Sequence, residues 1–282
     1  MDAAKKLQKQ LKSDEITVAP GAYDGLSARL VEKAGFSAVY ASGGAIARSF
    51  GVPDIGLLSL TEVADRLAQM TAAVDIPLIA DADTGFGNAN NVERTVHIFE
   101  SAGVAALHLE DQSFPKRCGH LDDKSLVSQE EMIEKLYAAC EARKNADTKI
   151  IARTDAIAVE GIDSALKRAQ AYHAAGADLL FVEAPESIEQ IKLIAQSLSC
   201  TLVINMFVGG KTPLVPLKEL KEWGYRLVII PSDTQRAAIY AIQKTLSVIR
   251  ENGDSGTYQD SMVSFQEREI IVGTAGYLKR RS

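Results

Sequence analysis

The feature that most restricts the fold of this chain is a regular alternation of short apolar segments with longer stretches of helical periodicity. Eight apolar segments span residues 16–21, 38–42, 78–83, 106–111, 149–155, 179–184, 201–206 and 226–231. Most are nearly continuous hydrophobic runs in which polar and apolar positions do not alternate. This pattern is typical of parallel strands that are buried on both faces.

The segments between these strands have the periodicity of helices. They span residues 26–34, 61–74, 92–102, 128–143, 163–175, 187–198 and 216–223. Three of them end in an Ala-Gly pair, at Gly35, Gly103 and Gly176, and a left-handed glycine commonly ends a helix. Eight strands with intervening helices predict an α/β fold, a (β/α)8 barrel. A doubly wound open sheet is the alternative, although Gly43-Gly44 does not match the GxGxxG fingerprint of dinucleotide-binding folds.

All 282 residues are expected to form one barrel domain, in which residues 234–282 are a C-terminal helical extension. Residues 234–251 have helical periodicity, and a polar stretch that contains glycine follows them. The tail beyond it is rich in apolar residues, among them Phe265, Ile270 and Tyr277. We therefore expect one or two helices there that pack on the barrel or on a neighbouring subunit.

The composition excludes several classes of protein. With 46% hydrophobic and 24% charged residues, the chain has the balance of an ordinary globular domain. A net charge of −6 without a basic cluster argues against nucleic acid as a partner. Three widely spaced cysteines, Cys118, Cys140 and Cys200, fit a reducing cytoplasmic compartment better than a disulfide framework. The amino-terminal segment resembles a short amphipathic helix rather than a signal peptide, and no apolar run is long enough to span a membrane.

Unusual polar residues lie at the predicted carboxyl ends of the strands, where a (β/α)8 barrel carries its active site. These residues are Tyr40, Ser42, Gly43, Gly44, Asp81, Asp83, Glu110, Asp111, Arg153, Asp155, Glu183, Asn205 and, one turn after the last strand, Arg236. We therefore predict a polar site at this end of the barrel.

Asp81 and Asp83 are two positions apart on the third predicted strand, so both are expected to point to the same face. Two carboxylates on one face repel each other unless a cation lies between them. Oxygen ligands suit Mg²⁺, with Mn²⁺ as a possible substitute. The alternative is an aspartate that caps the following helix. Glu110 is a candidate for holding a metal-bound water, and its alternative is a buried ion pair with Arg153.

The run Ser42-Gly43-Gly44 offers backbone N–H groups that suit the binding of a carboxylate, although a tight turn is the simpler alternative. Arg153 and Arg236 suit bidentate carboxylate binding, but arginines on barrels also serve structural roles. The run and both arginines are therefore candidate substrate ligands.

The fourth strand is followed by Pro115-Lys116-Arg117-Cys118-Gly119-His120. Two cations and a histidine beside Cys118 favour its thiolate, and a thiol–thiolate pair exchanges protons near neutral pH. The alternative is a charged surface loop with an incidental cysteine.

Several motifs resemble those of the isocitrate lyase/phosphoenolpyruvate mutase superfamily, and the resemblance covers nearly the whole chain. The matching motifs are Ser42-Gly43-Gly44, Gly51-Val52-Pro53-Asp54, Asp81-Ala82-Asp83-Thr84-Gly85-Phe86-Gly87, His108-Leu109-Glu110-Asp111-Gln112, Lys116-Arg117-Cys118-Gly119-His120 and Ala152-Arg153-Thr154-Asp155-Ala156. The motif around Cys118 is the most specific, because in this superfamily it marks carbon–carbon lyases rather than phosphonate-forming mutases. The chain is most similar to the branch of 2-methylisocitrate and 2,3-dimethylmalate lyases.

The resemblance implies a barrel whose last helix is swapped onto a neighbouring subunit in a homotetramer. It implies Mg²⁺ near Asp81 and Asp83, with Asp54 and Glu110 close by through waters. The loop that carries Cys118 is expected to be a mobile lid. A small carboxylic acid substrate is expected to be bound by Ser42, Gly43, Gly44, Gly119, His120, Arg153, Glu183, Asn205 and Arg236.

The predicted reaction is Mg²⁺-dependent retro-aldol cleavage of a 2-hydroxy dicarboxylate to pyruvate and a second carboxylic acid. Tyr40 is the candidate base for the hydroxyl proton, with Arg153 beside the reacting group, and Cys118 is expected to protonate the carbanionic carbon. The methylisocitrate lyases have Thr and Glu where this chain has Phe207 and Val208. Because an unpaired buried carboxylate is costly, we expect a small alkyl-substituted malate as the substrate.

Three alternatives to this lyase remain open. One is a phosphoenolpyruvate or carboxyphosphonoenolpyruvate mutase, or a phosphonopyruvate hydrolase. Another is a hydrolase or decarboxylase of oxaloacetate, which needs a similar keto-acid site. The last is a barrel that binds metabolites without catalysis.

Overall fold

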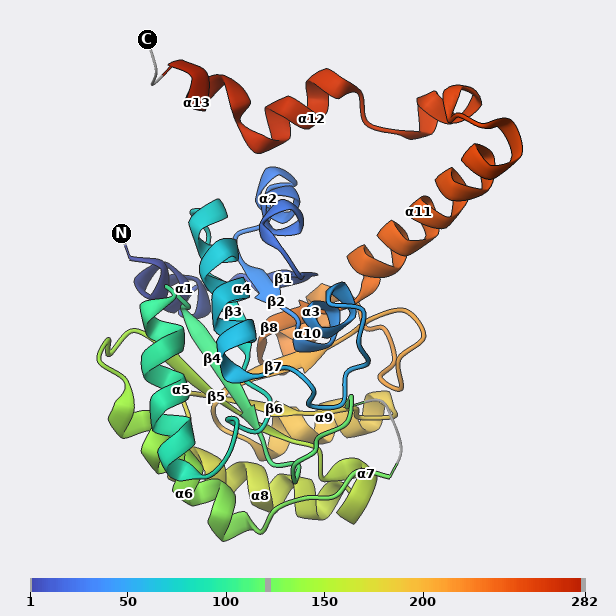
Figure 1. The fold of residues 1–282 in the computed structure, drawn as a ribbon. Helices are drawn as coiled ribbons and strands as arrows, with labels where there is room; N and C mark the ends of the chain where they lie inside the picture. Colours follow the sequence, from blue (N-terminus) through green and yellow to red (C-terminus); the bar gives the residue numbers. More distant parts are fainter. Residues whose placement is uncertain (1, 120–122, 280–282) are drawn as a thin grey trace.

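The computed structural model describes residues 2–119 and 123–279 (Figure 1). All eight predicted strands are present. They are β1 (Thr17–Ala22), β2 (Val39–Ala41), β3 (Leu78–Asp81), β4 (Ala106–Glu110), β5 (Lys149–Thr154), β6 (Leu179–Val182), β7 (Thr201–Asn205) and β8 (Tyr225–Ile230). Each strand pairs in parallel with the next, and β1 pairs with β8, which closes the barrel. The (β/α)8 prediction is confirmed, and the alternative of an open doubly wound sheet is wrong.

Helices surround the barrel where the periodicity predicted them. They are α2 (Gly25–Lys33), α4 (Leu60–Ala73), α5 (Ala89–Ser101), α6 (Gln129–Ala142), α8 (Ile162–Ala174), α9 (Ile188–Ser197) and α10 (Leu217–Trp223). Gly35, Gly103 and Gly176 have φ values of 87°, 85° and 107°, so each is left-handed just after its helix, as predicted. Two short helices, α3 (Gly43–Ser49) and α7 (Ile157–Glu160), were not predicted, because each is too short to show a clear periodicity.

Two layers of apolar side chains explain why the strands are almost continuously hydrophobic. Residues such as Leu107 and Leu109 of β4 point outward and pack against the helices. Residues such as Ala106 of β4 and Phe181 of β6 belong to a smaller core inside the barrel. Both faces of each strand are therefore covered, as expected for a parallel barrel.

The amino-terminal helix α1 (Ala3–Leu11) packs against the inner core of the barrel. Its side chains Ala4 and Leu7 are buried together with Ala19 and Leu227 of β1 and β8. Apolar side chains thus fill this end of the barrel, and buried carboxylates such as Asp81, Glu110 and Glu183 lie at the carboxyl ends of the strands.

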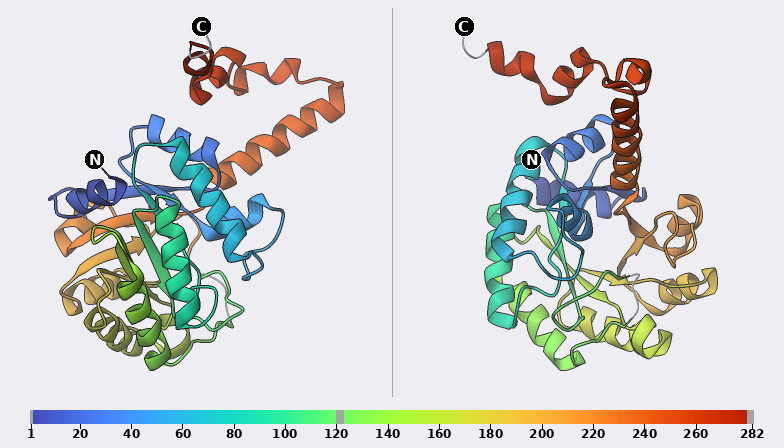
Figure 2. Two further views of the ribbon diagram at one scale, coloured as in Figure 1. Left: turned by 60° about the vertical axis from the view of Figure 1, so that its left-hand side comes forward. Right: turned by 45° about the vertical axis from the view of Figure 1, so that its right-hand side comes forward.

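After β8 the chain forms a C-terminal arm, defined here as residues 233–279. Its helices are α11 (Asp233–Asn252), η1 (Gly256–Ser261), α12 (Phe265–Val272) and α13 (Thr274–Lys279). The helix predicted over residues 234–251 is confirmed. Figure 2 shows α11 leading away from the barrel and the rest of the arm turning back, so that α12 lies over α2.

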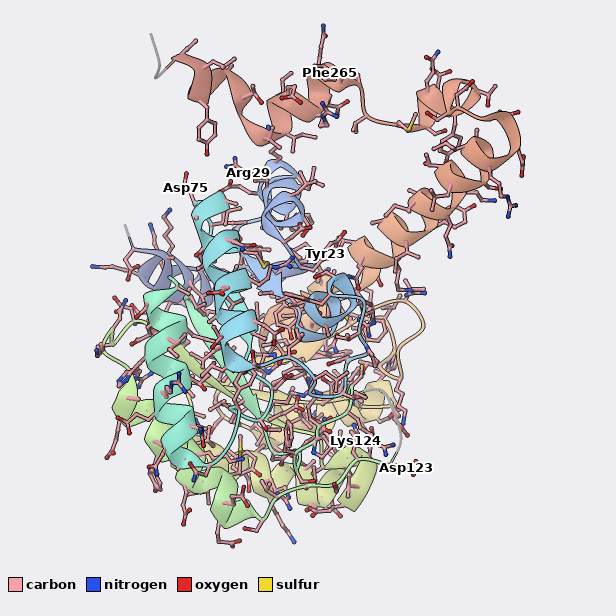
Figure 3. The ribbon with its side chains drawn as sticks, in the orientation of Figure 1. Tyr23, Arg29, Asp75, Asp123, Lys124 and Phe265 are labelled. Carbon is pink, nitrogen blue, oxygen red and sulfur yellow. The ribbon has the colours of Figure 1, made fainter. Side chains whose placement is uncertain are left out.

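Large apolar side chains of the arm are exposed within one subunit. Leu246 on α11 and Phe265 on α12 are 59% and 71% exposed, and Figure 3 shows Phe265 well away from the barrel. Packing of the arm on a neighbouring subunit stays a prediction. Among the described residues, no helix has both the length and the apolar character needed to cross a membrane.

Candidate active site

A cavity of about 400 Å³ opens at the carboxyl ends of the strands. The predicted site residues that line it are Tyr40, Ser42, Gly44, Asp54, Asp81, Cys118, Gly119, Arg153, Glu183, Asn205 and Arg236. Gly43, Asp83 and Glu110 lie behind this lining and contact its side chains. His120, predicted as a substrate ligand, lies outside the described residues. The sequence-predicted residues therefore converge on one cavity.

Asp81 and Asp83 do not lie on one strand face, which corrects the sequence prediction. β3 ends at Asp81, and Asp83 has a left-handed φ of 46°. The backbone N–H of Asp83 donates a hydrogen bond to Asp81 Oδ1 at 3.0 Å, which stabilises this turn. The alternation of side chains between the two faces of a strand no longer applies once the chain leaves the strand. Neither aspartate caps the next helix, because Asn88 does.

Lys116 is the counterion of this carboxylate group. Its Nζ lies 2.5 Å from Asp54 Oδ1 and 2.7 Å from Asp83 Oδ1, and its side chain is only 4% exposed. Burial lowers the pKa of Lys116, but the surrounding carboxylates, led by Asp83, raise it well above its usual value. Burial, together with Asp81 and Asp54, raises the pKa of Asp83 to about 6, although Lys116 opposes this shift. The site thus holds more negative charge than one ammonium neutralises.

Arg153, at the end of β5, joins three buried carboxylates. Its Nη1 lies 3.3 Å from Glu110 Oε2 and 3.3 Å from Glu183 Oε2. Its Nε and Nη2 donate to the two oxygens of Asp155 at 2.8 and 3.1 Å. The ion pair between Glu110 and Arg153, given above as an alternative, is therefore present. Asp111 supports the same strand end, because its Oδ1 accepts a hydrogen bond from the Asp155 N–H at 2.9 Å.

The Ser42-Gly43-Gly44 run forms the start of α3. Ser42 Oγ caps the helix by accepting a hydrogen bond from the Ala45 N–H at 3.3 Å. The Gly43 N–H donates to Asp81 Oδ2 at 3.2 Å, so this amide is already hydrogen-bonded to a carboxylate. A side chain at Gly44 would meet Asp54, because a Cβ there would lie 2.7 Å from Asp54 Oδ2. Small residues are thus required here by close packing against two aspartates.

Tyr40 lies inside the barrel and lines the cavity. Its hydroxyl oxygen is 2.7 Å from His108 Nε2 and 3.4 Å from Asp81 Oδ2. His108 is 1% exposed, stacks on the Tyr40 ring and meets the edge of Phe181, so it is a core histidine. Burial, followed by Asp81, raises the pKa of Tyr40 well above its usual value. The resting group is therefore a neutral phenol, hydrogen-bonded to an imidazole.

Cys118 and Gly119 line the cavity, and Gly119 lies against Arg153. A Cβ on Gly119 would lie 2.3 Å from Arg153 Nη2 and 2.8 Å from Glu183 Cγ. Only glycine permits this approach, which places the neighbouring Cys118 in the cavity lining. Asn205 Nδ2 donates to Glu183 Oε1 at 3.3 Å, so the ends of β6 and β7 are joined in the same network.

The residues at this end fit the predicted divalent cation. Six carboxylates, of Asp54, Asp81, Asp83, Glu110, Asp155 and Glu183, lie at this end together with the buried cations Lys116, Lys124 and Arg153. Five of them form ion pairs with these cations, whereas Asp81 lies 3.6 Å from His108 Nε2. The buried Glu110 Oε1 has no hydrogen-bond partner among the described residues. No three His, Cys, Asp or Glu side chains of residues 2–119 and 123–279 form a complete metal-binding group. Mg²⁺ uses few protein carboxylates, because water and substrate oxygens complete its coordination.

The family of the protein follows from comparison with known proteins. A family model described as phosphoenolpyruvate phosphomutase matches residues 7–250. The chain belongs to the phosphoenolpyruvate phosphomutase family. This confirms the superfamily resemblance drawn from the motifs around Asp81, Cys118 and Arg153.

Two relatives of this protein are named as lyases. A 2,3-dimethylmalate lyase of Eubacterium barkeri is 43% identical over 97% of this chain and 95% of its own length. A 2-methylisocitrate lyase of Aeropyrum pernix is 44% identical over 97% of this chain and 88% of its own length. A solved structure of oxaloacetate acetylhydrolase in complex with the inhibitor 3,3-difluorooxalacetate has a TM-score of 0.93 at 35% identity, covering 99% of this chain and 95% of that one. The protein is therefore an enzyme, and a lyase of the phosphoenolpyruvate phosphomutase family.

Several residues of this protein lie at the site but were not predicted from the sequence. Arg48 and Gln235 line the cavity from α3 and α11. Lys124 is buried behind the Cys118 segment and contacts Asp155. The helix that carries Arg48 was too short to predict, and a lysine in a polar loop gives no periodic signal. Only the three-dimensional contacts identify these three residues.

Proposed function

We propose that this enzyme cleaves an alkyl-substituted 2-hydroxy dicarboxylate, such as 2,3-dimethylmalate, to pyruvate and a second carboxylic acid. The observation that carries the proposal is a single cavity lined by Arg153, the carboxylate of Asp81 and the thiol of Cys118. Arg153 can bind a carboxylate of the substrate, Asp81 can hold a cation, and Cys118 can donate a proton. A carbon–carbon lyase of this type needs all three.

We propose Mg²⁺ as the cofactor, with Mn²⁺ as a substitute. Asp81 and Asp83 would hold it, with Asp54 and Glu110 contributing through water. When bound, the ion supplies positive charge that stabilises negative charge on the substrate oxygens. The excess of carboxylates over buried cations at the site supports this assignment.

The substrate carboxylate next to the hydroxyl carbon is assigned to Arg153 and to the Ser42-Gly43-Gly44 run at the start of α3. Arg153 is 7% exposed and already held by Asp155, so its guanidinium is fixed in orientation before the substrate binds. Glu183, Asn205 and Arg236 complete the pocket. Fixing the cation in advance lowers the reorganisation needed in the transition state.

Tyr40 is assigned as the base that removes the hydroxyl proton of the substrate. Its phenol oxygen lies beside the cavity and is hydrogen-bonded to His108 Nε2 at 2.7 Å. A proton taken up at Tyr40 therefore has an immediate acceptor in the imidazole. Tyr40 and His108 would act as one unit, because the buried phenol is neutral in the resting enzyme.

Loss of that proton lets the C2–C3 bond break. The electron pair of the bond moves to C3, and C2 becomes the carbonyl carbon of pyruvate. Cys118 then gives its thiol proton to C3, which releases the second carboxylic acid. The resulting thiolate regains a proton through solvent from the protonated base, so the enzyme returns to its starting state.

The wall of the cavity supports a substrate with a small alkyl group at its far end. Phe207 and Val208 line the cavity together with Ile229, Pro231 and Ile239. An alkyl substituent gains from contact with this wall, whereas a third carboxylate there would lose hydration. We therefore propose 2,3-dimethylmalate over 2-methylisocitrate.

The test is pyruvate release from 2,3-dimethylmalate and 2-methylisocitrate, side by side, with and without Mg²⁺. We expect Mg²⁺-dependent pyruvate and a higher kcat/KM for dimethylmalate. A clearly higher kcat/KM for methylisocitrate contradicts the substrate assignment while keeping the lyase. No pyruvate from either compound contradicts the lyase proposal itself.

Hydrolysis of oxaloacetate is the second candidate, favoured by the likeness to oxaloacetate acetylhydrolase over nearly the whole chain. That reaction needs the same binding of a 2-oxo carboxylate, but water first adds to C2. The C2–C3 bond then breaks with its electron pair on C3, which releases oxalate, and C3 is protonated to give acetate. Release of oxalate from oxaloacetate would identify it. Phosphorus NMR with phosphonopyruvate would identify a mutase or a phosphonopyruvate hydrolase.

We also propose that the enzyme is a cytoplasmic homotetramer in which the arm of each copy is swapped onto a neighbouring copy. The exposed apolar side chains of α11 and α12 support this. Neither a membrane nor nucleic acid is a proposed partner.

A further inference from the structure

Lys124 is a buried lysine that the reaction described above does not use. Its side chain is 1% exposed, although it lies in a loop and follows the exposed Asp123 (Figure 3). Its Nζ lies 2.9 Å from Asp155 Oδ1 and donates to the Gly119 carbonyl oxygen at 2.5 Å. A buried ammonium is costly unless it is paired, so these two contacts keep it in place.

The first of these contacts belongs to the carboxylate that orients Arg153. Asp155 Oδ1 accepts hydrogen bonds from Lys124 Nζ and, at 3.1 Å, from Arg153 Nη2. Asp155 Oδ2 accepts from Arg153 Nε at 2.8 Å. Lys124 and Arg153 therefore share one carboxylate, and a movement of either cation changes the contacts of the other.

The second contact belongs to the residue that follows the proposed proton donor. Gly119 lies against Arg153 so closely that a Cβ would be 2.3 Å from Nη2. Its carbonyl oxygen is held by Lys124 at 2.5 Å. Cys118 is one peptide bond away and lines the cavity, whereas Lys124 is not among the cavity-lining residues of the described chain.

We propose that Lys124 is a positioning residue that couples the backbone at Cys118 and Gly119 to Arg153 through Asp155. This inference rests on the proposed function, in which Arg153 binds the substrate and Cys118 donates the proton. One ammonium then fixes the distance between the thiol and the guanidinium. An error of about 1 Å in such a placement costs about 100-fold in rate.

Lys124 could also serve only to neutralise Asp155, which would be a purely structural role. The experiment must separate this role from the positioning of Cys118 and Arg153. The test variant is Lys124→Met, which keeps an unbranched buried side chain and removes the charge and the donor. Lys124→Arg is the rescue variant, because a guanidinium can still donate to both oxygens. Lys135→Met is the matched control. Lys135 is also buried, with a 5% exposed side chain, but it contacts the Thr84 carbonyl oxygen and Glu131, and none of these residues lines the cavity.

The first readout is steady-state pyruvate formation in the full-length enzyme with Mg²⁺ and its best substrate. We expect kcat of Lys124→Met to fall about 10- to 100-fold, with KM within about threefold of the wild type. Lys124→Arg should recover part of kcat, and Lys135→Met should keep it. A wild-type kcat in folded Lys124→Met, or a loss matched by Lys135→Met, overturns the proposal.

The second readout does not need turnover. Iodoacetamide alkylation of each cysteine is followed by peptide mass spectrometry in the wild type and the variants. We expect the alkylation rate of Cys118 to rise severalfold in Lys124→Met, while Cys140 and Cys200 keep their rates and serve as internal standards. An unchanged Cys118 rate overturns the proposal even if kcat falls. A wild type without lyase turnover would instead remove the proposed function and leave this measurement intact.

Lys124→Met must first be shown to be folded, by circular dichroism and thermal unfolding. If it does not fold, Lys124→Gln replaces it, because the neutral amide removes the charge that pairs with Asp155. The same two readouts and the same expected directions apply to this variant.

Discussion

The ammonium nitrogen of Lys116 lies 2.7 Å from Oδ1 of Asp83. This contact joins the segment that carries Cys118 to the turn that follows β3. The same nitrogen also contacts Asp54, so a single lysine holds two of the carboxylates assigned to the cation site. A divalent ion at this site therefore joins an existing ion-pair network.

The first prediction concerns the metal. Asp83→Asn removes one carboxylate from the proposed Mg²⁺ site and leaves Lys116 paired with Asp54. We expect Mg²⁺ affinity to fall about 10- to 100-fold, the range found when groups around a metal are removed. Isothermal titration calorimetry, with Mn²⁺ binding followed by electron paramagnetic resonance, measures this without turnover.

The control for this variant is Asp123→Asn, because the Asp123 carboxylate is 86% exposed and pairs with Arg117 rather than with Lys116. It should bind Mg²⁺ like the wild type. Unchanged Mg²⁺ affinity in folded Asp83→Asn would show that Asp83 forms an ion pair with Lys116 but does not bind the metal ion.

The second prediction concerns the proton donor. Cys118→Ser replaces the thiol with a much weaker acid of similar size. We expect kcat for pyruvate formation to fall about 10²- to 10⁴-fold, the usual contribution of a positioned acid or base. Folding and Mg²⁺ binding should be unchanged, which thermal unfolding and calorimetry would show.

Cys140→Ser and Cys200→Ser are matched controls for that substitution. Both thiols are partly buried, and neither lines the cavity. They should keep wild-type turnover. Near-normal turnover in Cys118→Ser would refute the role assigned to this residue.

The positions of the strands and the cavity could be predicted because they depend on local patterns. A strand buried on both faces is almost continuously apolar, so segments such as β4 are visible in the sequence. The topology then places the carboxyl ends of all strands together. Residues from different strands, such as Asp81 and Arg153, are therefore brought to one cavity before any contact is known.

The contacts between those residues could not be predicted, because they depend on where each strand ends. Asp83 is not on β3, since the chain turns there through a left-handed residue. Lys124 has no periodic signal, yet its side chain is buried against Asp155. The partners of Arg153 likewise depend on side-chain geometry rather than on spacing.

The third prediction concerns substrate preference. Phe207→Thr removes an aromatic ring from the apolar wall of the cavity and makes room for a larger acid. We expect the ratio of kcat/KM for dimethylmalate over methylisocitrate to fall about tenfold or more, since one methylene in such a pocket is worth about 1–3 kcal/mol. Leu214→Thr is the control, because Leu214 is 59% exposed and does not line the cavity. An unchanged ratio in Phe207→Thr would show that this wall does not select the substrate.

The fourth prediction concerns assembly. Phe265 is 71% exposed on α12 within one subunit, and a charge there would disfavour burial in an interface. We expect Phe265→Asp to lower the molar mass measured by light scattering below that of the wild-type oligomer. Tyr137→Asp, at a residue 54% exposed on α6, is the control and should keep the wild-type mass. A monomeric wild type would contradict the tetramer proposal directly.

The last prediction concerns stability against acid. Burial raises the pKa of Asp155, but Arg153 and Lys124 more than offset this and lower it to about 2. A carboxyl group whose pKa is lower in the folded than in the unfolded protein stabilises the fold above its unfolded pKa. That stabilisation is lost as pH falls through the folded value. The Asp155 carboxylate should therefore stabilise the fold fully at neutral pH and progressively less as the pH falls from about 4 to about 2.

Asp155→Asn tests this, because the amide cannot carry the charge and leaves Arg153 and Lys124 buried with fewer partners. We expect the free energy of unfolding in urea at pH 7 to fall by about 3–5 kcal/mol, the usual cost of removing one partner of a buried ion pair. The difference from the wild type should then narrow below about pH 4, because the wild-type carboxyl loses its charge as well. Asp123→Asn should show neither effect. A difference that stays constant from pH 7 to pH 3 would mean that Asp155 stabilises the site by its shape and hydrogen bonds, and that its charge contributes little.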